Sequence, residues 1–206
     1  SIDVNPHLEW KKFRKEKMEG MVLLERTLWD MPEIEAVGGI AMSPYSTSTS
    51  ISGVEVEGRP VNAHTNHATD GTTEVLQVDL IAGRWFSKED DGAIQPPAII
   101  NEGLAMDLYG TIDVLGKELP FNKQRVVGIV RDFRKAGKFS LPVPYLLSRI
   151  RTTDTTGNLE TWDILIRTRS GVSAQFQEKL VRTLESVQKG WTFKVDRLEQ
   201  VRQSDF

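Results

Sequence analysis

The 206-residue chain contains no cysteine. It therefore has no disulfide framework, no thiolate metal site and no cysteine nucleophile. It also lacks any run of 18 or more apolar residues, which a membrane-spanning helix requires, and Ser1 opens no signal peptide with a charged and then an apolar region. Since the chain starts at Ser1 rather than at Met, we expect it to be part of a longer protein.

An excess of charge of one sign is also missing. The chain has 26 Lys and Arg against 29 Asp and Glu, which gives a net charge of -3. Nucleic-acid binding usually requires a basic face, so no nucleic-acid partner is expected. With 39% hydrophobic and 27% charged residues, the composition is that of an ordinary folded protein of one or two domains.

The usual signatures of nucleotide binding and serine hydrolysis are absent. There is no Gly-x-Gly-x-x-Gly string and no Gly-x-Ser-x-Gly elbow. The segment from Gly110 to Glu118 superficially resembles a phosphate loop. However, five residues rather than four lie between Gly110 and Gly116, and Glu118 stands where a hydroxyl residue is required. The sequence therefore predicts no nucleotide site in this chain.

Three adjacent acids, Glu89, Asp90 and Asp91, could in principle supply general acid and base groups. Such catalysis needs two carboxyl groups that flank a pocket and have well separated pKa values. Acids followed directly by Gly92 are typical of a solvated turn instead. We therefore expect no enzyme activity from this segment.

Possible metal ligands are concentrated in one place, at His64, His67 and Asp70. Three-residue spacing aligns side chains on a helix, but on a strand it points the two histidines to opposite faces. The local Asn, Thr and Gly content disfavours a helix. The sequence favours a polar hairpin loop, with a metal site as the less favoured alternative.

The first 50 residues predict a helix from about residue 6 to 30, a strand at 34–42 and a polar loop at 44–52. The helix assignment rests on apolar side chains that recur along one helical stripe: Trp10, Phe13, Met21, Leu24 and Leu28.

The middle of the chain is rich in strand signals. A short helix at 102–109 is expected there, with Asn101 as its N-cap and Gly110 as its end. A turn is expected at Asp70 and Gly71. The expected strands are 54–56, 61–64, 98–101, 117–119 and 125–130.

The last 50 residues predict a strand at 161–168, a helix at 172–188 and a strand at 191–195. This order indicates a right-handed βαβ unit. Together with the first helix and strand it would form one α/β layer, interrupted by the β-rich middle. The predicted boundaries are 1–50 and 156–206 for the layer and 51–155 for the insertion.

One ordered set of residues gives a more specific signal. Its members follow one another through the middle of the chain in this order: Gly83, Arg84, Phe86, Asp90, Asn101, Ala105, Gly116 and Gly128. Their order and spacing resemble those of the periplasmic domain of MacB/FtsX-type ABC transporter permeases. We expect structural roles for these residues, with Arg84 paired to an acid such as Asp90 or Asp132.

The resemblance implies an α+β fold, in which a discontinuous α/β porter subdomain carries an inserted β-rich sabre subdomain. It implies a non-catalytic domain on the periplasmic face of the bacterial inner membrane, with membrane helices before Ser1 and after Phe206. The domain would couple cytoplasmic ATP hydrolysis to export of peptide, drug or lipoprotein, or to activation of a partner. The porter strand expected before the first helix is hard to find in Ser1–Asn5.

The resemblance also implies the partners. No cofactor is expected in this domain, because ATP and magnesium belong to a separate cytoplasmic ATPase. A second permease copy and a periplasmic adaptor or cargo are the other expected partners, and Phe139, Leu141 and Tyr145 are candidate contact residues. The rival interpretations are a free-standing secreted binding protein, a metal-dependent hydrolase using the His64 cluster, and a purely structural adhesin-like β domain.

Overall fold

The computed structural model describes residues 6–44, 46, 48–132, 141–151 and 163–198. Helices and strands follow one another in this order: α1 (Pro6–Trp29), β1 (Ile34–Ile40), β2 (Ser50–Val56), β3 (Arg59–Ala68), α2 (Thr72–Leu76), β4 (Leu80–Gly83), the 3-10 helix η1 (Lys88–Asp90), β5 (Pro97–Asn101), α3 (Glu102–Tyr109), β6 (Arg125–Val130), β7 (Tyr145–Arg149), β8 (Asp163–Thr168) and α4 (Ala174–Val187).

The described strands form one mixed sheet of eight strands. Its order is β4-β6-β5-β7-β3-β1-β8, and β2 pairs with β3 beside this path. The pairs β5–β6 and β3–β7 are parallel, and the other pairs are antiparallel. Helices and strands in a mixed sheet confirm the predicted α+β class. This one sheet contains strands from all three predicted segments. The division of the chain into subdomains at residues 50 and 155 therefore stays a prediction.

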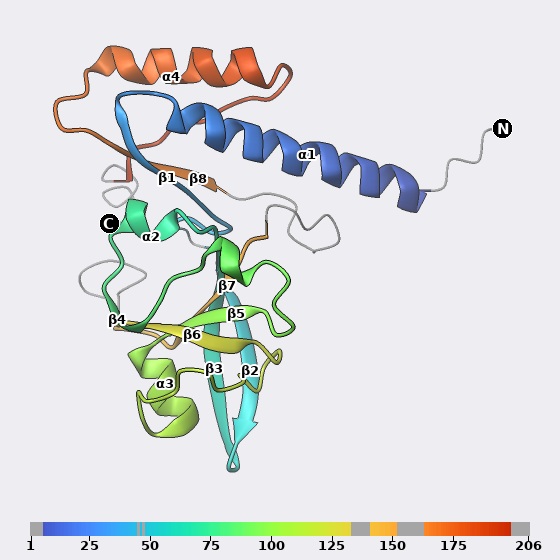
Figure 1. The fold of residues 1–206 in the computed structure, drawn as a ribbon, viewed down its shortest axis with the longest axis vertical. Helices are drawn as coiled ribbons and strands as arrows, with labels where there is room; N and C mark the ends of the chain where they lie inside the picture. The colour runs from blue at the N-terminus through green and yellow to red at the C-terminus, as the bar shows by residue number, and fades with distance from the viewer. Residues whose placement is uncertain (1–5, 45, 47, 133–140, 152–162, 199–206) are drawn as a thin grey trace.

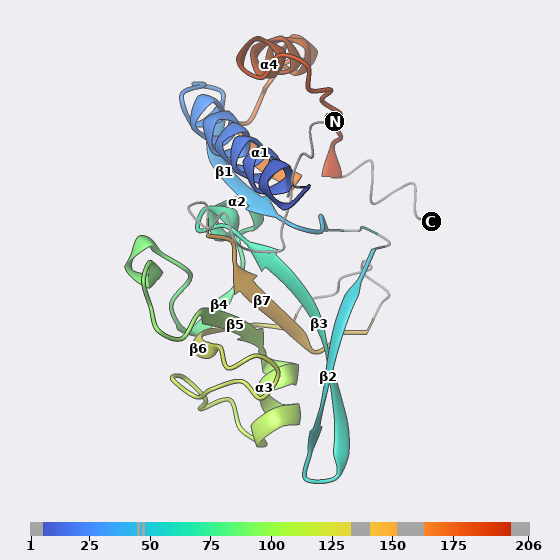
Figure 2. The same ribbon diagram turned by 90° about the vertical axis from the view of Figure 1, so that its right-hand side faces the viewer.

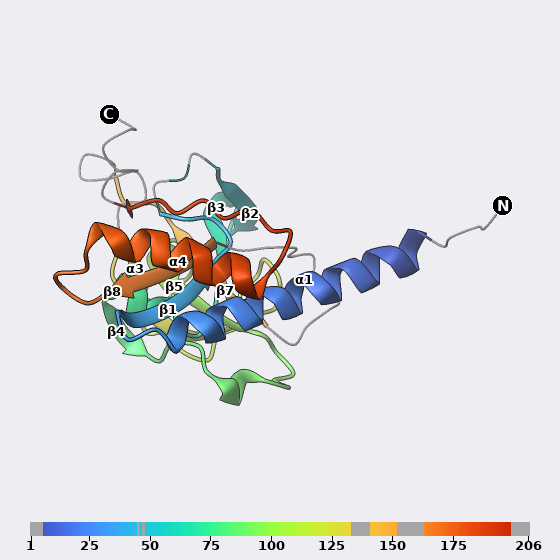
Figure 3. The same ribbon diagram turned by 90° about the horizontal axis from the view of Figure 1, so that it is seen from above.

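Helices cover the two ends of the sheet (Figures 1 and 2). Helices α1 and α4 lie over β1 and β8 at one end, and α3 lies beside the β2–β3 hairpin at the other. Seen from above, the first turns of α1 reach beyond the sheet (Figure 3). No described helix is long and apolar enough to cross a membrane.

The α1 and α4 end has its own hydrophobic core. Its buried members come from α1, the turn after it, β1 and α4: Leu24, Leu28, Met31, Ile34, Val37, Phe176, Leu180 and Leu184. The apolar stripe predicted for the first helix is therefore confirmed where its side chains are described. Helix α4 buries one face in the same core. Burial of each such side chain contributes about 1.5–3 kcal/mol.

The predicted strand at 191–195 is wrong, because residues 191–197 form no helix or strand. The alternation that suggested a strand is real, since Trp191, Phe193 and Val195 are half-buried and the residues between them are exposed. They pack against the α1 and α4 core instead of pairing with a strand. Alternation reports that one side of a segment is buried, not what covers it. The predicted βαβ unit at 161–195 is therefore wrong, and β8 lies antiparallel to β1. A βαβ arrangement occurs instead in the middle of the chain, where α3 lies in sequence between the parallel strands β5 and β6.

The predictions for the middle of the chain are mostly confirmed. The predicted helix 102–109 coincides with α3, where Asn101 Oδ1 accepts a hydrogen bond from the backbone N–H of Leu104 and Gly110 is left-handed. The predicted strand 125–130 coincides with β6. Segment 117–119 contributes only one bridge, between Glu118 and Arg125. Helix α2 and strands β4 and β7 were not predicted.

The predicted strands 54–56 and 61–64 belong to a longer hairpin, β2–β3. Its turn consists of Glu57 and Gly58, both with positive φ (50° and 76°). This geometry matches the right-handed twist of the two flanking strands. Seven register pairs join the strands, from Ser50↔Thr65 to Val56↔Arg59.

Candidate functional site

Arg84 and Asp90 form a two-pronged ion pair in the segment that follows β4. The guanidinium donates from Nη1 to Asp90 Oδ2 at 2.9 Å and from Nη2 to Asp90 Oδ1 at 2.6 Å. Asp90 Oδ2 also accepts from the backbone N–H of Ser87, which caps η1. The expected pairing of Arg84 with an acid is therefore found with Asp90.

This geometry keeps Asp90 ionised although it is only 4% exposed. Hydrogen bonds from Arg84 hold the pKa of Asp90 below its ordinary value, and they outweigh the opposite effect of burial. The same pair raises the pKa of Arg84. A carboxylate saturated with donors is a poor proton carrier, so the pair fixes the shape of the 84–90 segment rather than offering acid–base chemistry.

Asp132, the other acid considered for Arg84, serves a second centre built on Asn101. The Asn101 amide donates to Asp132 Oδ1 at 2.6 Å and to the carbonyl of Val143 at 2.8 Å. Its Oδ1 accepts from the backbone N–H of Tyr145 at 2.7 Å, besides capping α3. Asn101 is 1% exposed and joins β5, α3, the end of β6 and the start of β7.

The other residues of the ordered set lie at buried positions, in close backbone contacts or in a turn, and a structural role for them stays a prediction. Gly83 (φ +73°) and Gly128 are register partners, and a Cβ on Gly128 would collide with the carbonyl of Arg84. Phe86 and Ala105 are buried in two different hydrophobic clusters. Gly116 has φ +79° in a turn with open space around it.

Arg149, at the end of β7, is a residue that the sequence reasoning missed. Its side chain is 6% exposed and donates to both oxygens of Asp70 and to Asp91 Oδ1 at 2.6 Å. These contacts raise the pKa of the guanidinium, led by the hydrogen bonds to Asp70. The available signal was an arginine beside the apolar run Leu146–Leu147, because a buried charge requires partners.

The candidate metal ligands are placed apart from one another. His64 and His67 lie three residues apart on β3, so they face opposite sides of the strand. His64 Nδ1 lies 2.8 Å from Thr49 Oγ1, and Asp70 is held by Arg149. Among the described residues no group of three or more His, Cys, Asp or Glu could hold a metal ion.

The candidate contact residues differ in exposure. Leu141 is 82% exposed and is open to a partner, whereas Tyr145 is 6% exposed and its hydroxyl accepts from Asn66. Phe139 lies outside the described residues. A contact role for these residues stays a prediction, and of the two described ones only Leu141 is on the surface.

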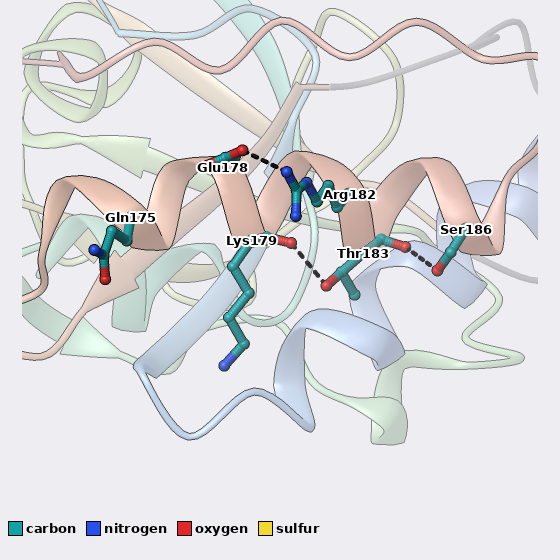
Figure 4. Close-up of a pocket in the computed structure, with 6 residues that line it drawn as sticks. All are labelled: Gln175, Glu178, Lys179, Arg182, Thr183 and Ser186. Carbon is teal, nitrogen blue, oxygen red and sulfur yellow. Dashed lines mark hydrogen bonds and ion pairs between the residues drawn. The ribbon is translucent and has the colours of Figure 1, made fainter.

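A groove of about 330 Å³ runs along the outer face of α4 (Figure 4). It is lined by polar side chains of this one helix: Gln175, Glu178, Lys179, Arg182, Thr183 and Ser186. Glu178 and Arg182 pair with each other, and Lys179 pairs with Glu33. The charged groups are thus engaged in surface ion pairs and do not converge on a substrate-sized space.

Comparison with known proteins agrees with the fold. Residues 7–183 match the family described as the MacB-like periplasmic core domain. The periplasmic region of MacB from Actinobacillus actinomycetemcomitans is similar, with a TM-score of 0.59 and 19% identity over 81% of this chain and 73% of that chain. The extracellular domain of the noncanonic ABC-type transporter YknZ from Gram-positive bacteria has a TM-score of 0.54 and 16% identity over 83% and 81%. No curated protein sequence matches the chain.

Proposed function

Because the chain belongs to the family of MacB-like periplasmic core domains, we propose that it is the extracytoplasmic domain through which an ABC transporter permease transmits the work of cytoplasmic ATP hydrolysis. Its task is mechanical and non-catalytic. Motion enters through the end that carries α1 and α4 and is delivered at the end that carries the β2–β3 hairpin and α3.

The observation that carries this proposal is the continuous sheet that joins these two ends. A domain that transmits motion must not deform under load, and densely packed, hydrogen-bonded layers deform little. Buried ion pairs such as Arg149 with Asp70 reinforce the middle of the sheet. The charged groups of the described site are bound to each other, which supports a structural role for them.

The partners follow from this proposal. ATP and magnesium belong to a cytoplasmic ATPase that acts on this domain through the membrane part of the permease, and a second permease copy stands beside the first. Cargo or a periplasmic adaptor meets the domain on its outer surface, where Leu141 is exposed. The work delivered is export of a peptide, drug or lipoprotein, or activation of a periplasmic partner, on the periplasmic face of the inner membrane.

The test uses the intact permease and its ATPase in liposomes. One spin label is placed at Glu185 on α4 of each copy, after replacement of any cysteine elsewhere in the permease. We expect the distance between the two labels to change between the ATP-bound and the nucleotide-free states. A hydrolysis-deficient ATPase is the control and should hold the ATP-bound distance. An unchanged distance in all states would overturn the proposal.

A further inference from the structure

The connection between the two ends of the sheet is narrow in its strand pairing. Strands β1 and β3 share a single register pair, Ile40↔Ala68. On one side of this pair lie β1, β8, α1 and α4, and on the other side lie α3 and the strands from β2 to β7 (Figure 2). Helix α2 follows β3 in the chain and packs against β1 and β8. A hinge commonly lies at the end of a helix or strand, where few contacts restrain the chain. A single register pair between β1 and β3 could therefore act as a hinge between the two ends of the sheet, unless other contacts hold them together.

Asn66 extends the pairing on one side of this register pair. Its Oδ1 accepts from the backbone N–H of Met42 at 3.1 Å, and its Nδ2 donates to the carbonyl of Met42 at 2.8 Å. A side-chain amide thus makes the two bonds that a neighbouring strand would make. Asn66 is 1% exposed, and its Nδ2 also donates to the hydroxyl of Tyr145 at 2.9 Å, which brings in β7.

Two threonines extend the pairing on the other side. Gly39 donates its N–H to Thr69 Oγ1 at 2.7 Å, and its carbonyl accepts from the Thr69 N–H at 2.8 Å and from Thr72 Oγ1 at 2.7 Å. Both threonines are buried. The backbones also touch, since a Cβ on Gly38 would lie 2.6 Å from Cα of Thr72.

The same short segment is anchored to the rest of the molecule. Asp70 forms an ion pair with Arg149 of β7, and the carbonyl of Thr69 accepts a hydrogen bond from Trp85 Nε1 at 3.3 Å. Contacts therefore lead without a break from β1, through the start of α2, to β7 and the segment after β4. Buried, fully paired polar networks of this kind resist opening.

We propose that the junction formed by residues 39–42 and 66–72 is a rigid coupling, so that the two ends of the sheet turn as one body. This inference rests on the proposed function, since it specifies how motion entering at α1 and α4 reaches the hairpin. A hinge would place few and exposed contacts at the crossing. Here the crossing contacts are numerous, and the side chains that make them are buried.

The rigidity is measured on the 206-residue chain itself. Because it has no cysteine, a Cys pair introduced at exposed Glu55 of β2 and Glu185 of α4 carries two spin labels across the junction. A second Cys pair, at Glu55 and Asp107 of α3, lies on one side of the junction. It gives the width of the distance distribution that the labels themselves produce. We expect both pairs to give single distance distributions of equal width. A broad or two-peaked distribution for the crossing pair alone would overturn the inference.

Substitutions then attribute the rigidity to the named contacts. Asn66→Leu combined with Thr72→Val removes the hydrogen bonds of Asn66 and Thr72 across the junction while it keeps the number of side-chain heavy atoms. We expect the distance distribution between the labels at Glu55 and Glu185 to become about two-fold wider. Thr65→Val is the matched control, because Thr65 Oγ1 donates to Ser50 within the hairpin only. An unchanged width in the double variant would contradict the assignment.

Hydrogen exchange keeps the assignment testable if the double variant folds poorly. Thr72→Val alone should speed exchange of the Thr69 and Ala41 amides about ten-fold, since a lost hydrogen bond lowers the free energy of local opening by about 1.4 kcal/mol, which corresponds to that ratio of rates. The control Thr65→Val should not. Unchanged exchange would count against a role for Thr72.

The two proposals fail separately. Suppose that the junction is rigid but the distance between the Glu185 labels of the two permease copies does not change with nucleotide in liposomes. That result would contradict the proposed function alone. A flexible junction in a domain that still moves with nucleotide would sink the rigid coupling alone.

Discussion

Arg149 binds Asp70 through two parallel hydrogen bonds, from Nε to Oδ1 at 2.7 Å and from Nη2 to Oδ2 at 2.8 Å. One partner lies at the end of β7 and the other just after β3, two strands that run parallel. The third donor of the same guanidinium reaches Asp91, beyond η1. One buried side chain thus fixes the spacing of three segments that are distant in sequence.

Arg149→Met should destabilise the fold by about 2–3 kcal/mol, because hydrogen bonds to charged groups are lost and two acids remain without their cation. The matched control is Arg131→Met, which breaks an ion pair with Asp79 whose side chains are 59% and 61% exposed. An exposed pair contributes little to stability, because solvent screens it. Urea unfolding of both variants measures the difference, and equal losses would refute a special role for Arg149.

Asp90→Asn should cost stability at neutral pH and little in acid. The pKa of Asp90 is lowered in the folded state, so its contribution is present above the unfolded pKa and is lost as the pH falls through the folded value. We expect a loss of about 1–2 kcal/mol at pH 7, discounted because Arg84 is half-exposed.

Urea unfolding at pH 7 and again below pH 3 gives this comparison. The loss should shrink in acid, since the wild-type carboxyl is then increasingly protonated. Asp107→Asn, on the exposed face of α3, controls for removal of one negative charge. A loss that is equally large at both pH values would show that the pair does not titrate as proposed.

Gly128→Ala should be more damaging than Gly116→Ala. A Cβ on Gly128 meets the carbonyl of Arg84 and lies 3.2 Å from Leu80 Cδ1, so strands β4 and β6 must separate. Overpacking of this kind costs about 1–3 kcal/mol or more. Gly116 has open space and only the strain of its positive φ, roughly 1–2 kcal/mol. Thermal unfolding ranks the two, and the reverse order would contradict this account of the sheet.

The purified chain should retain no stoichiometric zinc after dialysis, because His64 and His67 face opposite sides of β3. Elemental analysis by mass spectrometry tests this directly. His64→Ala and His67→Ala should leave the metal content unchanged. One zinc per chain that is lost in either variant would restore the metal-site alternative.

Local signals predicted helices α1, α3 and α4 but not α2, and they predicted the ion pairs and hydrogen bonds of the site only in part. The caps Asn101 and Gly110 define α3, because the groups that end a helix lie within a few residues of it. The Arg84–Asp90 ion pair could be predicted for the same reason, because the two residues are close in sequence. The partners of Arg149 lie 79 and 58 residues away, and no local pattern encodes such a contact.

The failure at 191–195 has a related cause. The sequence shows that one side of this segment is buried, but strand pairing depends on which edge of a sheet is free. The close approach of Gly38 to Thr72 likewise depends on the three-dimensional fold. Contacts made by whole layers leave few marks on a single stretch of sequence.

The tight turn at Glu57 and Gly58 has a consequence for the order of folding. The β2–β3 hairpin closes over two residues, whereas His64↔Tyr145 and Ile34↔Thr168 join segments about 80 and 130 residues apart. Pairings of such long range form slowly, so we expect the hairpin to serve as an early template. Strand β7 would then pair with β3 late, and until it does, the open edge of β3 is the surface on which a newly made chain is most prone to associate with its neighbours.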